Sequence, residues 1–156
     1  MKKGATEVLH VSETRRHMAT DFSLLVSVEQ AHVKRAQRTL EEAHAQLLIL
    51  EKEISEFHPD SPIYQLNRSA PGRAISLPPS ACALWKRALE LKSISGGAFD
   101  PYVKSCSGSL GFHFDAFQGM AWRLDEGAKL SFAAIGKGFG IDHVRTILEA
   151  ESFYDY

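Results

Sequence analysis

The sequence predicts an α+β fold in which helices pack on a mostly antiparallel sheet. Helical and strand-like segments both occur, and residues 119–124 and 128–133 are expected to pair as a hairpin around a turn at 125–127, where glycine supplies a positive φ. The chain has 156 residues, of which 44% are hydrophobic, so it is long enough to bury one core. Residues 18–156 are therefore expected to form a single domain.

The first half of the chain is expected to contain an arm, a strand and a long helix. Residues 1–17 are polar and aperiodic, which indicates a flexible N-terminal arm. Phe22–Val28 is rich in aliphatic and β-branched residues, as strands are. From about residue 31 to 57 the apolar residues recur at spacings of three or four, which predicts a surface helix with one buried face. They are Ala36, Leu40, Ala43, Leu47, Leu50 and Ile54.

The second half is expected to alternate loops with two further helices. Residues 58–62 contain two prolines and break the long helix, and a short apolar segment follows at Ala74–Leu77. Ser80 is a candidate N-cap for a helix that runs to Leu91 and ends at Gly96 and Gly97. A Ser/Gly-rich loop is expected at residues 105–109, and the last helix at about residues 138–150.

Composition excludes several classes of protein. The net charge of −1 gives no reason to expect a nucleic-acid partner. Cys82 and Cys106 lack metal-ligand spacing and are typical of a reducing compartment. No apolar region follows Lys2 and Lys3, and no run is long enough to span a membrane, so a cytoplasmic location is expected. The seven histidines are scattered, and Trp85 is expected in the core.

The segment Ala133–Asp142 is the strongest functional signal. Its alternate glycines allow close backbone approach and leave N–H groups for an anion, and the segment leads into a helix. It is not a Walker loop, because Gly138 follows Lys137 where Ser or Thr is needed, and Ile141 breaks a dinucleotide GxGxxG pattern. A phosphate-bearing ligand and simple helix packing are both compatible with these glycines.

Four segments in the same order resemble one family. Met18–Thr20 is similar to its Met-Gly-Thr, and Ile54–Asn67 to its helix-end signature of an aromatic, Pro-Asp-Ser and a late Asn. Gly96–Pro101 matches Gly-Ala-Phe-Asp-Pro almost letter for letter, and Ala133–Asp142 resembles Gly-Gly-Ile-Ala-Lys-Gly-Tyr-Ala-Val-Asp. The family is that of the ApbE-type FAD:protein FMN transferases, older descriptions of which read "thiamine biosynthesis lipoprotein".

The resemblance implies that the protein binds FAD with Mg²⁺ and transfers FMN to a threonine of a target flavoprotein. The resemblance also implies that Met18 contacts the nucleotide, that Phe57 packs on a ring face, and that Gly136 gives its carbonyl oxygen to Mg²⁺. The remaining cofactor-binding positions that the resemblance implies are Ala98, Phe99, Asp100, Ala133 and Lys137. Four of these positions, and Asp142, also have a plainer interpretation. Asp100 is also suited to capping a turn before Pro101, Lys137 to solvent, Asp142 to a local contact within its helix, and Met18 and Phe57 to the core.

The chain departs from the family pattern in extent. It corresponds to roughly the N-terminal half of a usual member, the stretch between Pro101 and the glycine-rich loop is short, and the acidic side chain that completes the Mg²⁺ site is missing. Three hypotheses stay open. The protein is a transferase whose site is completed by a complementing chain or a second copy, a non-catalytic relative that binds flavin or protein, or a fragment without stable function. Family members are often exported, which stands against the cytoplasmic expectation.

Overall fold

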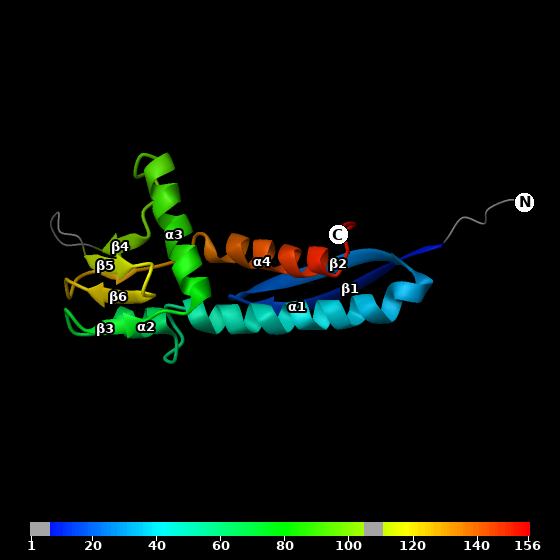
Figure 1. The fold of residues 1–156 in the computed structure, drawn as a ribbon, viewed down its shortest axis with the longest axis horizontal. Helices are drawn as coiled ribbons and strands as arrows, with labels where there is room; N and C mark the ends of the chain where they lie inside the picture. Colours follow the sequence, from blue (N-terminus) through cyan, green and yellow to red (C-terminus); the bar gives the residue numbers. More distant parts are fainter. Residues whose placement is uncertain (1–6, 105–110) are drawn as a thin grey trace, which may run out of the picture. The chain divides into compact units, whose positions relative to one another are not determined.

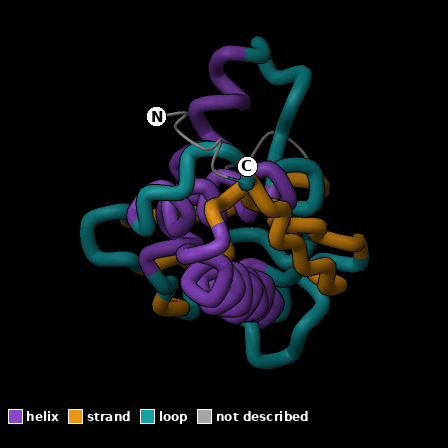
Figure 2. Tube along the Cα trace, turned by 90° about the vertical axis from the view of Figure 1, so that its right-hand side faces the viewer, coloured by secondary structure: helices purple, strands orange, loops and turns teal. Residues whose placement is uncertain are grey.

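The structure is a computed structural model that describes residues 7–104 and 111–156 (Figure 1). The chain divides into two compact units, one made of residues 1–49 and 140–156 and the other of residues 50–139. They are called unit 1 and unit 2 below. Helices, strands and long connections all contribute to the fold (Figure 2), as expected for the α+β class. The prediction of a single domain over residues 18–156 stays a prediction.

Unit 1 begins with a β-hairpin. Strand β1 (Val8–His17) pairs antiparallel with β2 (Thr20–Glu29), and His17 lies opposite Thr20. The two residues between them, Met18 and Ala19, have φ values of 49° and 61°. Positive φ at both central positions is typical of the tight turns whose twist matches that of paired strands. The expectation of a flexible arm is therefore wrong for residues 8–17, whose alternation of half-buried and exposed side chains is that of a strand with one covered face.

The hairpin is covered by helices. A short 3₁₀ turn, η1 (Gln30–His32), leads into α1 (Val33–Ile54), and α4 (Gly136–Ala150) follows late in the chain. The periodicity predicted for α1 is confirmed, because its residues at spacings of three or four are buried in this core. The buried core of unit 1 consists of Phe22, Val26, Val28, Ala36, Leu40, Ala43, Leu47, Val144, Leu148 and Phe153.

A pair of buried histidines joins the hairpin to α1. Nε2 of His17 lies 3.0 Å from Nδ1 of His44, and the rings stack with centroids 5.2 Å apart. Nε2 of His44 donates to the carbonyl oxygen of Glu13 at 3.3 Å. His17 is the last residue of β1 and His44 lies on α1, and both rings are buried inside unit 1.

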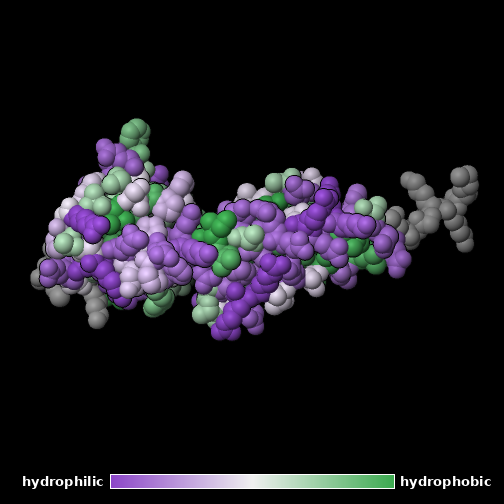
Figure 3. All heavy atoms as spheres, turned by 90° about the horizontal axis from the view of Figure 1, so that it is seen from below, coloured by the Kyte–Doolittle hydropathy of each residue, from purple (hydrophilic) through white to green (hydrophobic). Residues whose placement is uncertain are grey.

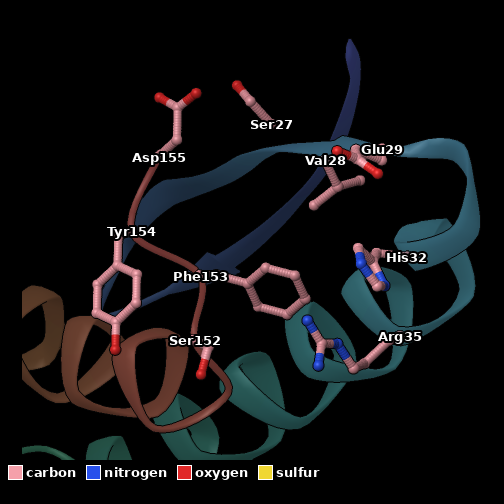
Figure 4. Close-up of a pocket in the computed structure, with 9 residues that line it drawn as sticks. All are labelled: Ser27, Val28, Glu29, His32, Arg35, Ser152, Phe153, Tyr154 and Asp155. Atoms are coloured by element: carbon pink, nitrogen blue, oxygen red, sulfur yellow. The ribbon is translucent and has the colours of Figure 1, made fainter. Parts of the chain in front are cut away.

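The C-terminal residues form a shallow pocket on unit 1 (Figure 4). The Phe153 ring is buried, and the Arg35 guanidinium lies 4.8 Å from its centroid. The backbone N–H of Ser27 donates to the carbonyl oxygen of Asp155 at 2.9 Å, so the chain end is fastened to β2. The pocket therefore lies where β2, the start of α1 and the C-terminal segment meet.

Unit 2 contains short strands in two sheets. Strands β3 (Ala74–Ser76), β6 (Met120–Arg123) and β5 (Phe112–Asp115) form one sheet in that order, and β4 (Tyr102–Lys104) pairs with β7 (Lys129–Leu130). All described pairs are antiparallel. The helices are α2 (Pro62–Leu66) and α3 (Pro79–Ile94).

The core of unit 2 is aromatic. Trp85 on α3 is fully buried, as predicted, and stacks on Phe114 with centroids 4.6 Å apart and planes 3° from parallel. The rings of Phe112 and Phe132 meet its edge or face at 5.9 and 6.2 Å. Such offset and edge contacts stabilise a small core beyond the apolar area they bury.

Several predicted elements of unit 2 are wrong. Residues 119–124 and 128–133 do not form a hairpin, because β6 pairs with β3 and β5 whereas β7 pairs with β4. The turn between them does exist, since Gly127 N–H donates to Asp125 Oδ1 at 2.7 Å. Ser80 is not the N-cap of α3. Pro78 holds that position, because its missing N–H costs nothing at a helix start, and Ser80 Oγ instead donates to Glu53. The loop predicted at residues 105–109 and Cys106 lie outside the described residues.

The surface seen in Figure 3 is mostly hydrophilic, and the described helices are not membrane spans. Hydrophilic residues cover most of the face seen in Figure 3, with smaller hydrophobic patches between them. Among the described residues, none of the helices combines the length and apolar content that crossing a bilayer requires. Cys82 is a buried free thiol, and burial raises its pKa although Lys86 opposes the shift.

Candidate functional site

The residues singled out by sequence are divided between the two units. Met18 belongs to unit 1, where it forms the hairpin turn and packs against the core. The others belong to unit 2. They are Phe57, Ala98, Phe99, Asp100, Ala133, Gly136 and Lys137.

Phe57 is held at the end of α1 with its ring in solvent. Ser55 Oγ accepts hydrogen bonds from the backbone N–H groups of Phe57 and His58, each at 3.1 Å, and so forms a turn directly after the helix. The Phe57 side chain is 76% exposed, which excludes the core interpretation within this structure. The Lys129 ammonium lies 5.9 Å from the ring centroid, within the range of a cation–π contact.

A buried carboxylate stands directly beside Phe57. The Glu56 side chain is 8% exposed, and its Oε2 lies 2.7 Å from Lys129 Nζ. Its other oxygen, Oε1, accepts a hydrogen bond from Ser131 Oγ. Ser131 Oγ in turn accepts from the backbone N–H of Ala133 at 3.3 Å. These contacts link the end of α1 to the loop that leads into α4.

Asn67 fixes the strand that carries these partners. Its Nδ2 donates to the carbonyl oxygen of Leu130, and its Oδ1 accepts from the N–H of Leu130, both at 2.8 Å. The side-chain amide thus replaces a neighbouring strand along this stretch of β7. Arg123, which is buried, donates to the backbone oxygens of Asn67, Asp125 and Glu126. The late asparagine of the helix-end motif is therefore a structural clamp.

The segment Gly96–Asp100 forms a tight turn after α3. Gly96 and Gly97 have φ values of 60° and 86°, as the residue after a helix often requires. Asp100 Oδ1 accepts from the N–H of Tyr102 at 3.0 Å, and Oδ2 lies 2.7 Å from Lys92 Nζ. Asp100 thus caps a turn, in agreement with the plainer of its two interpretations. Ala98 is exposed and Phe99 half-buried.

The glycine-rich loop enters α4 through a compact turn. The N–H of Gly136 donates to the carbonyl oxygen of Phe132 at 2.7 Å. Gly136 is buried, and a Cβ there would lie 3.4 Å from Ile54 Cδ1, close to an ordinary van der Waals contact. Gly138 differs, because nothing lies within 4 Å of a Cβ built on it. Ala133, Ala134 and Lys137 are exposed.

The family model for the ApbE family matches residues 18–156. The chain belongs to the ApbE family. Its fold is similar to that of three solved ApbE structures, which are 14–18% identical to it and so establish the fold alone. Among curated proteins, none matches this chain.

The solved ApbE structures are considerably longer than this chain. The flavin transferase ApbE from Vibrio cholerae aligns with a TM-score of 0.81 and 14% identity, over 94% of this chain and 55% of its own. The flavinyl transferase ApbE of Pseudomonas stutzeri gives 0.76 and 18%, over 96% and 57%. The apbe protein from Thermotoga maritima gives 0.76 and 17%, over 92% and 54%. The chain therefore spans little more than half of these ApbE structures.

Magnesium does not fit the described part of this ApbE-family chain. Among residues 7–104 and 111–156, no three His, Cys, Asp or Glu side chains gather as a metal site. The carbonyl oxygen of Gly136 is a single ligand, whereas Mg²⁺ requires near-octahedral oxygen coordination. The described residues therefore do not by themselves form a magnesium site.

Sequence reasoning missed Glu56, Lys129 and Ser131. Glu56 stands among the charged residues at the end of α1, where a solvated face is the ordinary interpretation. The available signal was the spacing of Lys129 and Ser131 on either side of the apolar Leu130, which places both on one side of an extended segment. Their common partner became apparent only in the folded structure.

Proposed function

We propose that this chain is the flavin-nucleotide-binding part of an FAD:protein FMN transferase. In the reaction, a threonine oxygen of the target flavoprotein attacks the FMN phosphorus of FAD. The new phosphoester P–O bond forms as the pyrophosphate P–O bond breaks, AMP leaves, and the hydroxyl proton passes to a base or to solvent. Family membership over residues 18–156 supports this proposal.

The exposed Phe57 ring is the observation in the site that carries the proposal. A phenyl ring that is 76% exposed offers a face on which a planar ring can stack. The ammonium of Lys129 near that ring would favour the negative charge of a nucleotide. Lys137 is exposed in the first turn of α4, where the N–H groups of a helix start suit a phosphate, and Ala133 is exposed in the loop before it.

We further propose that Mg²⁺ and the catalytic geometry depend on polypeptide outside the described residues, supplied by a complementing chain or a second copy. The donor set of the described residues supports this, because no three His, Cys, Asp or Glu side chains gather there to join the Gly136 carbonyl oxygen. The target would be a flavoprotein with an accessible threonine. Met18, Ala98, Phe99 and Asp100 remain proposed contacts to the nucleotide.

The test is a titration of the protein with FAD, followed by flavin fluorescence, with and without Mg²⁺. Saturable binding that Mg²⁺ tightens, and that Phe57→Ala weakens, would support the transferase. Phe117→Ala is the matched control, because Phe117 is also an exposed phenylalanine of unit 2, with 99% of its side chain accessible. Binding indifferent to Mg²⁺, with no FMN transferred to an acceptor protein, would favour a non-catalytic flavin-binding relative. Absence of FAD binding by the folded protein would overturn the proposal.

A further inference from the structure

The Glu56 carboxylate is buried and is held by two side-chain partners. Its side chain is only 8% exposed, and both oxygens have partners: the ammonium of Lys129 and the hydroxyl of Ser131. A buried carboxylate without such partners is strongly unfavourable, so the position of Glu56 and those of its partners depend on one another.

Both partners lie on one rigid segment. Lys129 and Ser131 flank Leu130, which is fully buried and held on both its N–H and its C=O by Asn67. The N–H of Ser131 also donates to the carbonyl oxygen of Pro101 at 2.9 Å. Successive side chains of an extended segment alternate in direction, so Lys129 and Ser131 face Glu56 together.

The exposed Phe57 ring and the exposed Ala133 loop both contact partners of Glu56. Phe57 follows Glu56 directly in the chain, and its ring lies near the Lys129 ammonium. The N–H of Ala133 donates to the Ser131 hydroxyl that Glu56 holds. One buried carboxylate is thus connected through Lys129 to an aromatic face and through Ser131 to the loop before α4.

We propose that Glu56 is a positioning residue that holds the Phe57 ring and the Ala133 loop as one surface for a planar, negatively charged nucleotide. Lys129 has a second role in this surface, because its side chain is 43% exposed and its ammonium can donate to the ligand while Glu56 holds it. This inference rests on the proposed function for the identity of the ligand. The positioning itself is independent of that function.

The experiment compares Glu56→Gln, Lys129→Met and Lys129→Arg with wild type, in the full chain. The matched control is Glu90→Gln, which breaks an exposed ion pair with Arg87 on α3 of the same unit. Hydrogen exchange is measured at the amides of residues 131–135 and of α3, and FAD affinity by fluorescence titration. The urea midpoint of each variant checks that it folds. If Glu56→Gln does not fold, Lys129→Met still tests the proposal.

We expect Glu56→Gln to accelerate exchange at Ala133 by about tenfold or more and to raise the Kd for FAD about tenfold, the scale of one charge-assisted hydrogen bond. Lys129→Met should weaken FAD binding similarly, Lys129→Arg should restore it, and Glu90→Gln should change neither property. A merely structural role would lower the urea midpoint of the variants without raising the Kd for FAD of the folded protein.

The two failures are distinguishable. If wild type binds FAD but the Glu56 and Lys129 variants bind equally well with unchanged exchange, the positioning role is wrong and the proposed function stands. If wild type does not bind FAD, the proposed function and the nucleotide surface are both wrong, and the exchange rates decide by themselves whether Glu56 holds the loop.

Discussion

The side chain of Asn67 acts as a strand partner for Leu130, and replacing it by alanine measures what that clamp contributes. The substitution removes two hydrogen bonds of 2.8 Å and leaves the N–H and C=O of Leu130 without their partner. Leu130 is fully buried, so water cannot readily replace the amide. Each unsatisfied buried group costs about 1–3 kcal/mol, which predicts that unit 2 loses about 2–4 kcal/mol of unfolding free energy after partial relaxation.

Urea unfolding followed by tryptophan fluorescence is the suitable assay. Both tryptophans, Trp85 and Trp122, belong to unit 2, so the signal reports on that unit alone. With an m-value of about 1–2 kcal/mol/M, the midpoint should fall by at least about 1 M. Gln65→Ala, on the same short helix and exposed, should shift it little. A loss below about 0.5 kcal/mol for Asn67→Ala would refute the clamp, because such a loss is typical of surface positions.

Three further predictions concern backbone strain, packing and pH. Ala19→Gly should stabilise unit 1 by about 1 kcal/mol, seen as a higher Tm, because alanine at φ 61° is strained and glycine is not. Gly140→Ala should destabilise it by about 1 kcal/mol, because the added Cβ would lie 3.1 Å from Leu47 Cδ2, whereas Gly138→Ala, with open space around it, should not. Burial raises the pKa of Tyr102, so the folded state retains that proton after the unfolded state has lost it. The unfolding free energy should therefore fall as pH rises above about 10, and Tyr102→Phe should reduce this slope in urea titrations.

Helix α1 and strand β2 of unit 1 could be predicted from the sequence. The apolar spacing of Ala36, Leu40 and Leu47 predicts both the helix and its buried face, since a helix needs only local periodicity. Strand β2 was predicted, but β1 was not, because its only apolar residues are Val8, Leu9 and Val11, and Val8 is exposed. A strand of mostly polar residues is recognised by its partner and not by its own composition.

Pairing in unit 2 could not be predicted from local patterns. Met120–Arg123 and Lys129–Leu130 are joined by a real turn, yet each finds its partner elsewhere in the chain. The turn is held by the Asp125 side chain and by Arg123, which donates to the backbone oxygens of Asp125 and Glu126, so it needs no hairpin to stabilise it. Side-chain clamps of this kind carry little sequence signal.

The site residues identified from sequence stay predictions, and the buried contact beside Phe57 was not among them. Family motifs identified Phe57 and Ala133, which the structure leaves accessible. They gave no indication of Glu56, because a buried ionic contact depends on segments more than seventy residues apart meeting in the fold. The same motifs identified Asp100, whose carboxylate the structure engages with Tyr102 and Lys92.

The histidine pair of unit 1 has a consequence for how the hairpin assembles. Because the Glu13 carbonyl can only accept, His44 presents a proton at Nε2 and a lone pair at Nδ1, and His17 must donate to that lone pair. This fixes the direction of both hydrogen bonds that His44 makes to the hairpin. A slip of β1 by one residue would carry His17 to the opposite face of the ribbon and leave His44 facing no donor. The imidazole pair therefore adds a polar constraint on the strand alignment to the one that the buried side chains of Phe22, Val26 and Val28 already impose.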